Sequence, residues 1–162
     1  MSDKNALNKL MDDLVSRGNQ WVVFDTETTG LDGAAEICQI GLLSPHGEVL
    51  MDQLIKPDDP IPAEASRIHG ITNEMVKGAP RIWELEHEIR ASMDGKLIVV
   101  YNAPFDERML IQSFMRTYNP DYGQGHAKSW PGRWFNNLEF ADVMIPYADY
   151  YGDWNDYHGN YR

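Results

Sequence analysis

Two carboxylates, Asp25 and Glu27, stand two positions apart at the end of an apolar run in the stretch 21–31 (WVVFDTETTGL). The four large apolar residues of 21–24 are typical of a strand buried on both faces. In a strand, side chains at i and i+2 project from the same face. Like charges raise each other's pKa, so such a pair is stable mainly with a cation between them. Oxygen ligands of this kind favour Mg²⁺ or Mn²⁺. The alternative is that both are ordinary acids, because Asp-x-Glu after a strand is common.

A third acid, Asp106, follows a second apolar run at 96–101. Pro104 is permitted at the start of a helix, which places Asp106 in the first helical turn. The helix dipole favours a carboxylate there, and this is a purely structural explanation. We expect the strand at 96–101 to pair in parallel with 21–24 through a crossover helix. That pairing would bring Asp106 near the first two acids and favours the metal-ligand interpretation.

Three strings resemble one known family. Residues 24–31 (FDTETTGL) resemble the first motif of the DEDD-type 3′–5′ exonucleases, which include the proofreading subunit of bacterial DNA polymerase III and ribonuclease T. Residues 102–106 (NAPFD) resemble the second motif. Residues 69–76 (HGITNEMV) resemble a segment that in this family lies beside the 3′ end of the substrate. The resemblance covers roughly 22–142.

The resemblance implies an α/β fold like that of ribonuclease H, with a mixed sheet flanked by helices. It implies a metal-dependent exonuclease that releases nucleoside 5′-monophosphates from the 3′ end of single-stranded DNA or RNA, with DNA favoured. The implied cofactors are two Mg²⁺ or Mn²⁺ ions. The implied catalytic and metal-binding residues are Asp25, Glu27 and Asp106. The implied substrate-binding residues are Thr28, His69, Asn102 and Phe105. For His69, a structural bond to the backbone is an equally good explanation.

The third motif of this family is missing from the chain. It carries a histidine with an aspartate five residues later, or a tyrosine with an aspartate four residues later. No histidine here has an aspartate five positions on, and no tyrosine from Tyr101 onward has one four positions on. We therefore expect a single exonuclease domain over 1–162 that is truncated at its C-terminus and is poorly active alone. The alternative is a non-catalytic exonuclease-like module that binds nucleic-acid ends or a protein partner.

Composition restricts the function further. The chain has 162 residues and a net charge of −11, so it lacks the basic footprint of a metal-independent nucleic-acid binder. Its single cysteine, Cys38, fits a reducing, cytoplasmic environment and a small apolar role in a strand. No apolar run is long enough to span a membrane, and no signal peptide is recognisable.

The remaining elements follow from periodicity and turn residues. An amphipathic helix is expected within the N-terminal segment 1–18, at 3–17, ending at Gly18. Strands at 34–43 and 49–56 should form an antiparallel meander with 21–24. Further helices are expected at 63–68, 72–76, 80–93, 104–115 and 145–151, a fifth strand at 134–142, and loops at 123–128 and 154–162.

The sequence also predicts the roles of two further acids and the buried side of one helix. Glu36 is interpreted as an ordinary surface carboxylate, and Asp142 as a structural or supporting residue at the end of the fifth strand. On the helix that carries Asp106, a series of apolar residues should form the buried side: Phe105, Met109, Leu110, Phe114 and Met115.

Overall fold

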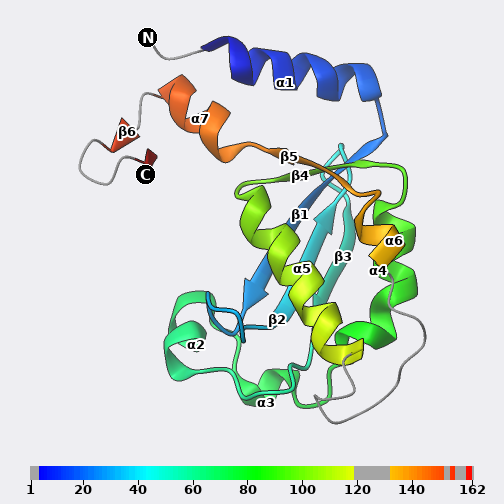
Figure 1. The fold of residues 1–162 in the computed structure, drawn as a ribbon, viewed down its shortest axis with the longest axis vertical. Coiled ribbons are helices and arrows are strands. Elements are labelled where there is room, and N and C mark those ends of the chain that lie inside the picture. The colour runs from blue at the N-terminus through cyan, green and yellow to red at the C-terminus, as the bar shows by residue number, and fades with distance from the viewer. Residues whose placement is uncertain (1–3, 119–131, 152–153, 156–159, 162) are drawn as a thin grey trace.

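The computed structural model describes residues 4–118, 132–151, 154–155 and 160–161, and a five-stranded mixed sheet lies at its centre (Figure 1). The strand order is β3-β2-β1-β4-β5. β1 pairs antiparallel with β2, and β2 with β3, whereas β1 and β4, and β4 and β5, are parallel. The strands are β1 (Trp21–Thr28), β2 (Ile37–Leu43), β3 (Val49–Leu54), β4 (Leu97–Val100) and β5 (Glu139–Asp142). The predicted meander followed by parallel strands is confirmed.

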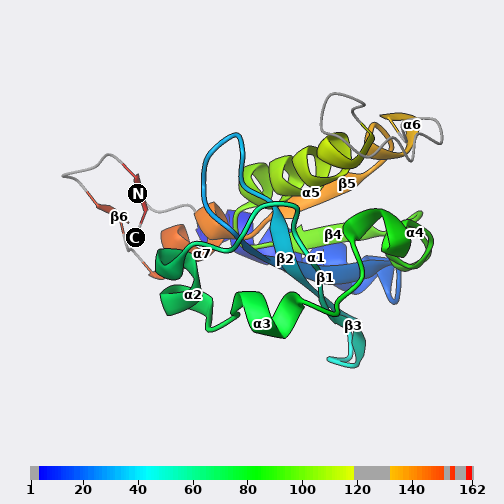
Figure 2. The same ribbon diagram turned by 90° about the horizontal axis from the view of Figure 1, so that it is seen from below.

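Helices flank this sheet, as the sequence predicts. They are α1 (Lys4–Arg17), α2 (Ala63–His69), α3 (Asn73–Val76), the 3₁₀ turn η1 (Ile82–Leu85), α4 (Glu86–Met93), α5 (Ala103–Tyr118), α6 (Gly132–Phe135) and α7 (Met144–Tyr151). α5 runs across one face of the sheet, and α2 and α3 lie together at one end of the molecule (Figures 1 and 2). α1 lies beside α7 (Figure 1).

The main core lies between the sheet and the helices α4, α5 and α6. Val22 and Phe24 of β1 are fully buried in it, whereas Trp21 and Val23 on the other side of the strand are only half-buried. That other side packs against α1, where Leu14 is buried but Val15 is exposed. Burial of β1 on both faces, as predicted, is therefore only partly correct, because α1 covers its side incompletely.

A second, smaller core joins the sheet to α2 and α3. Its buried members are Cys38, Ile61, Ile71 and Val76. Thr72 caps α3 by accepting a hydrogen bond from the backbone N–H of Met75, as the sequence predicts. Cys38 has the small apolar role in a strand that was expected of it.

The predicted fifth strand starts too early. Residues 132–135 form α6, and the strand begins only at Glu139. Trp134 and Phe135 are buried there with tilted rings 4.8 Å apart, and both pack edge-on against Phe114 of α5. Aromatic side chains satisfy strand and helix patterns equally well, and packing against α5 decides between the two.

Other helix and strand boundaries differ less from the predicted ones. The helix expected at 80–93 begins as the 3₁₀ turn η1 before α4, and β2 starts three residues after the predicted position 34. Residues predicted as a C-terminal loop include the paired strands β6 (Trp154–Asn155) and β7 (Asn160–Tyr161). Met115 was predicted to be buried and is 54% exposed, because it lies on the outer side of α5. The loop expected at 123–128 lies outside the described residues.

Two glycines end helices as expected. Gly18, after α1, and Gly95, after α4, both have positive φ angles, which glycine adopts without a steric penalty. Among the helices described, none combines the length and apolar character needed to cross a membrane.

Candidate metal-binding site

The carboxyl end of β1 presents the first two predicted acids. Asp25 is exposed and Glu27 is half-buried, and the alternation along the strand puts both on the same face of the sheet. The intervening Thr26 is buried on the opposite face, which α5 covers. The predicted side-by-side arrangement of the two carboxylates is therefore present in β1.

Asp106 reaches this strand from α5. It lies in the first helical turn, is only 5% exposed, and its Oδ1 accepts a 2.7 Å hydrogen bond from Oγ1 of Thr26. The pKa of Asp106 is raised to about 6: burial and the negative charge of Asp25 raise it, and the hydrogen bond from Thr26 lowers it. The second-motif acid thus lies within electrostatic reach of the first.

The charge of Asp25 also affects the pKa of Glu27. Its pKa is raised mainly by burial, and the charge of Asp25 raises it further, whereas His69 lowers it. Asp25 therefore makes ionisation less favourable at both other acids. A divalent cation would relieve this repulsion, and carboxylate oxygens are suitable donors for Mg²⁺ or Mn²⁺.

The three acids do not form a closed cluster. Within the part of the chain that the structure describes, no three His, Cys, Asp or Glu side chains gather closely enough to hold one metal ion together. The reason is geometric, since Asp25 and Glu27 project from one face of β1 and Asp106 is bound to Thr26 on the other. The donor chemistry fits the metal, and the assignment of these three residues as its ligands stays a prediction.

The start of α5 is held by groups around Asp106. The carbonyl of Asn102 accepts hydrogen bonds from the backbone N–H groups of Phe105 (3.0 Å) and Asp106 (3.3 Å). Asp142, at the end of β5, accepts one from the N–H of Ala103 with Oδ2, at 3.2 Å. Its Oδ1 also accepts one from the N–H of the residue that begins α7. The structural role predicted for Asp142 is confirmed.

The predicted substrate-binding residues Thr28 and Phe105 make side-chain contacts within the chain. The Thr28 hydroxyl donates to the Gly30 carbonyl at 2.8 Å and so fixes the turn after β1. The ring of Phe105 is half-buried, and the Arg108 guanidinium lies over it, 5.5 Å from its centroid. Asn102 is half-buried where β4 meets α5. Contact of these residues with a substrate stays a prediction.

His69 has the structural bond that the sequence left open. Its Nδ1 accepts a 3.0 Å hydrogen bond from the N–H of Ile71, and its Nε2 lies 4.0 Å from Sγ of Cys38. Burial raises the pKa of the Cys38 thiol to about 12, so this cysteine stays protonated and unreactive. Because His69 also lowers the pKa of Glu27, the ring lies near the site as well as bonding the backbone.

Glu36 is not the surface carboxylate that the sequence predicted. Its side chain is 7% exposed and forms an ion pair with Arg116 at 3.5 Å. It also accepts hydrogen bonds from the backbone N–H groups of Asp58 (2.7 Å to Oε2) and Asp59. Burial raises the pKa of Glu36, and Arg116 opposes that shift. The prediction was wrong because the loop 57–60, distant in sequence, folds over this side chain.

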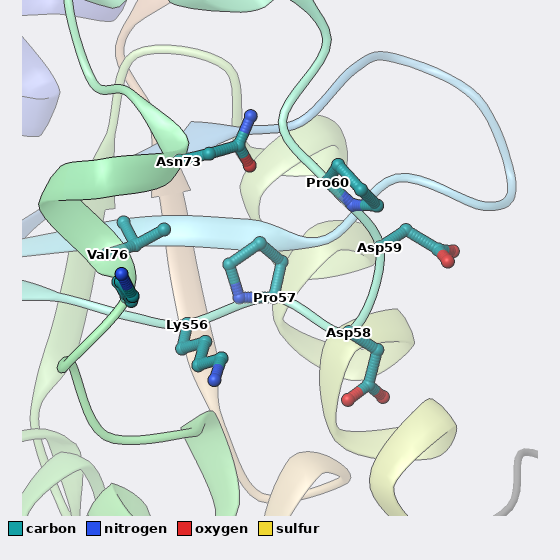
Figure 3. A pocket seen from close by; sticks show the side chains of 8 residues that line it. Lys56, Pro57, Asp58, Asp59, Pro60, Asn73 and Val76 are labelled. Atoms are coloured by element: carbon teal, nitrogen blue, oxygen red, sulfur yellow. The ribbon is translucent and has the colours of Figure 1, made fainter.

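A shallow pocket is lined by the loop that covers Glu36, and Asp25, Glu27 and Asp106 are not among its lining residues. It has a volume of about 190 Å³ and lies between the loop after β3 and α3 (Figure 3). Pro57 and Pro60 line it from the loop, and Asn73 and Val76 from α3. None of the predicted ligand or substrate residues lines this pocket.

Two sets of contributing residues escaped the sequence analysis. Thr26 lies between two acids in the first motif, and this position alone could have suggested that it supports the site. The polar residues Arg108, Gln112 and Arg116 are spaced by four along α5, and such a stripe predicts one common helix face.

Comparison with known proteins gives the family. The family model named RNase_T and described as "Exonuclease" matches residues 22–130 of the chain. The chain therefore belongs to the exonuclease family, and the predicted assignment to the DEDD-type 3′–5′ exonucleases, with the enzyme class of a phosphodiester hydrolase, is confirmed.

Relatives support this assignment. An uncharacterized exonuclease of Escherichia phage 186 is 38% identical over 143 residues, which are 85% of this chain and 69% of that protein. A DNA polymerase III subunit epsilon-like protein of Rhodobacter capsulatus is 44% identical over 56% of this chain, but only 14% of that protein is covered. The DNA polymerase III subunit epsilon of Rickettsia conorii is 34% identical, with 55% of this chain and 41% of that protein covered.

Solved structures support the fold. The complex of Escherichia coli exonuclease I with single-stranded DNA, in a zinc-bound form, matches with a TM-score of 0.62 at 19% identity, over 88% of this chain and 33% of that one. Exonuclease I without ligand matches with a TM-score of 0.61 at 21% identity, over 82% and 31%. The ribonuclease H-like fold is thus confirmed, and the chain spans about a third of exonuclease I.

Proposed function

We propose that this chain is the domain of a metal-dependent exonuclease that removes nucleoside 5′-monophosphates from the 3′ end of single-stranded DNA. The observation that carries the proposal is the placement of three acids on β1 and in the first turn of α5, joined by the Thr26–Asp106 hydrogen bond, within a domain of the exonuclease family. The charge of Asp25 on β1 raises the pKa of both Glu27 and Asp106, although Asp106 comes from a different element. A cytoplasmic location stays a prediction that depends on the single cysteine.

Asp25, Glu27 and Asp106 would hold the divalent ions. When bound, such ions activate a water molecule and stabilise the charge that develops on the leaving 3′ oxygen. The chain's own contribution is to keep the acids in place. The Thr26 hydroxyl orients the Asp106 carboxylate, and Asp142 fixes the start of the helix that carries it.

Single-stranded DNA is proposed as the substrate on two grounds. The matched relatives include DNA polymerase III epsilon subunits, and solved complexes of exonuclease I contain a dT13 oligonucleotide. The net charge of −11 makes tight binding without a metal unfavourable. We therefore propose that strand binding depends on the metal.

The second candidate function is a non-catalytic module that binds nucleic-acid ends. The geometry that favours it is that Asp25 and Glu27 project from one face of β1, whereas Asp106 is bound to Thr26 on the other. A general base contributes about 10²–10⁴-fold to a hydrolysis rate, so this chain should cleave slowly unless a base is supplied.

The test uses 5′-labelled single strands of DNA and RNA, Mn²⁺, and imidazole as an external base. We expect slow shortening from the 3′ end that requires Mn²⁺, is faster with imidazole, and is faster on DNA than on RNA. Asp25→Ala should abolish it. Glu48→Gln, an exposed carboxylate in the turn between β2 and β3, is the matched control and should leave it unchanged. Strand binding without any shortening would favour the binding module.

A further inference from the structure

Three polar side chains on α5 are aligned along one face of the helix. Arg108, Gln112 and Arg116 follow each other at intervals of four residues, so they stand above one another. All three donate hydrogen bonds to backbone carbonyls of the segment 31–35, which follows β1. We call these three side chains the α5 ladder.

The first two side chains of the α5 ladder bind both ends of this segment. Arg108 donates from Nη2 to the Leu31 carbonyl at 3.1 Å and from Nη1 to the Asp32 carbonyl at 3.3 Å. Gln112 donates from Nε2 to the same Asp32 carbonyl at 3.1 Å and also to the carbonyl of Ala35. A single neutral amide therefore bridges the two sides of the loop, at positions where a hydrophobic side chain would leave both carbonyls without this donor.

The last side chain of the α5 ladder, Arg116, binds residues that lead into β2. Arg116 donates to the carbonyl of Ala34 and forms the ion pair with Glu36. The neighbouring Ser113, also on α5, accepts a 2.9 Å hydrogen bond from the N–H of Ile37, the first residue of β2. The whole connection from β1 to β2 is therefore attached to α5 along its length.

The connection follows directly on the strand that carries Asp25 and Glu27, and it is attached to the helix that carries Asp106. Its start is closed by two hydrogen bonds between Thr29 and Glu36, at 2.8 and 2.9 Å, directly after the strand that carries Asp25 and Glu27. The helix that carries the ladder begins with the turn that holds Asp106. The ladder is thus a direct mechanical link between the two elements that supply the acids.

We propose that the α5 ladder sets the position of Asp106 relative to Asp25 and Glu27, and that Gln112 is its central positioning residue. This inference rests on the proposed function, because it concerns the acids as metal ligands. Residues that orient ligands without touching the metal contribute about 10–100-fold to affinity, since they fix the geometry before the ion arrives. Removing the amide should let the loop shift against the helix and separate the acids.

The test compares Gln112→Met with the wild-type chain. Methionine has a similar length and no donor, so the shape of the side chain is kept and both hydrogen bonds are lost. Met115→Ala on the outer side of α5 is the control, because Met115 lies outside the ladder and is 54% exposed. Mn²⁺ affinity is measured by titration calorimetry, and amide hydrogen exchange is measured at 34–37, both well below the melting temperature.

We expect Gln112→Met to bind Mn²⁺ about tenfold more weakly than the wild type and to exchange the amides of 34–37 faster. Met115→Ala should match the wild type in both measurements. Equal Mn²⁺ affinity in Gln112→Met and the wild type would overturn the positioning role, even if the variant melts at a lower temperature. Failure of the wild-type chain itself to bind Mn²⁺ would overturn the proposed function, and the inference with it, so the two failures are distinguishable.

Discussion

Glu36 and Asp106 are two buried carboxyl groups with opposite surroundings. Both are 5% exposed, and burial raises the pKa of both. Glu36 is paired with Arg116 and accepts backbone hydrogen bonds, whereas Asp106 accepts one from the Thr26 hydroxyl and faces the like charge of Asp25. Burial alone therefore does not identify a functional acid. The sign of the neighbouring charge does, because a compensated acid stabilises the fold and an uncompensated one favours a cation.

The largest expected loss of stability is at Glu36. Glu36→Gln removes the buried charge that pairs with Arg116, which keeps its exposed partner Asp59. Breaking a buried pair from one side typically costs about 3 kcal/mol. We expect the free energy of unfolding, measured by urea denaturation at pH 7, to fall by about that amount. Glu48→Gln, at an exposed position, should change it by less than about 0.5 kcal/mol. A loss at Glu36 as small as that of the control would contradict the structural role assigned to it.

Asp106→Asn should instead increase the free energy of unfolding at pH 7. A carboxyl pKa raised from 3.8 to about 6 means that the folded protein binds more protons than the unfolded chain in this range. Stability supplied by the protonated group is therefore lost as the pH rises through this window. We expect Asp106→Asn to be more stable than the wild type by about 1–2 kcal/mol at pH 7 after solvent screening, and equally stable near pH 3.5. Urea unfolding of both proteins at the two pH values measures this. Destabilisation at pH 7 would show that the Asp106 charge is compensated.

The smallest expected effect is at Thr26. Thr26→Val keeps the shape of the side chain and removes the hydroxyl that donates to Asp106, so the pKa of Asp106 should rise further. The loss of this one hydrogen bond should cost about 1 kcal/mol at pH 7. The pKa is measured from the carboxyl carbon signal of Asp106 in an NMR titration. An unchanged pKa would mean that this hydroxyl does not stabilise the carboxylate.

The sequence predicted the elements whose signals are local. The apolar runs at 21–24 and 96–101, the glycines after α1 and α4, and Thr72 at the start of α3 each depend on nearby residues, and the structure confirms them. The two motifs also placed the three acids on β1 and α5 correctly. Their exact ligand geometry was not predictable, because the face of β1 that each acid approaches depends on how α5 packs.

Features formed by distant segments were missed or misjudged. Glu36 has an ordinary sequence context, and its burial results from Arg116 and the loop 57–60 meeting over it. Trp134 and Phe135 were placed in a strand because aromatic residues favour strands, and packing against α5 made that turn helical. In both cases long-range packing, which no local pattern reports, determined the outcome.

Calorimetric titration of Mn²⁺ at pH 7 shows whether Asp25 binds the ion, with the wild-type chain, Asp25→Ala and Glu48→Gln measured side by side. Asp25 is the carboxylate whose charge acts on both Glu27 and Asp106. We therefore predict weak but measurable binding by the wild type and by Glu48→Gln, and none by Asp25→Ala. Equal binding by the wild type and Asp25→Ala would contradict the assignment of Asp25 as a ligand, because the ion would then be held elsewhere.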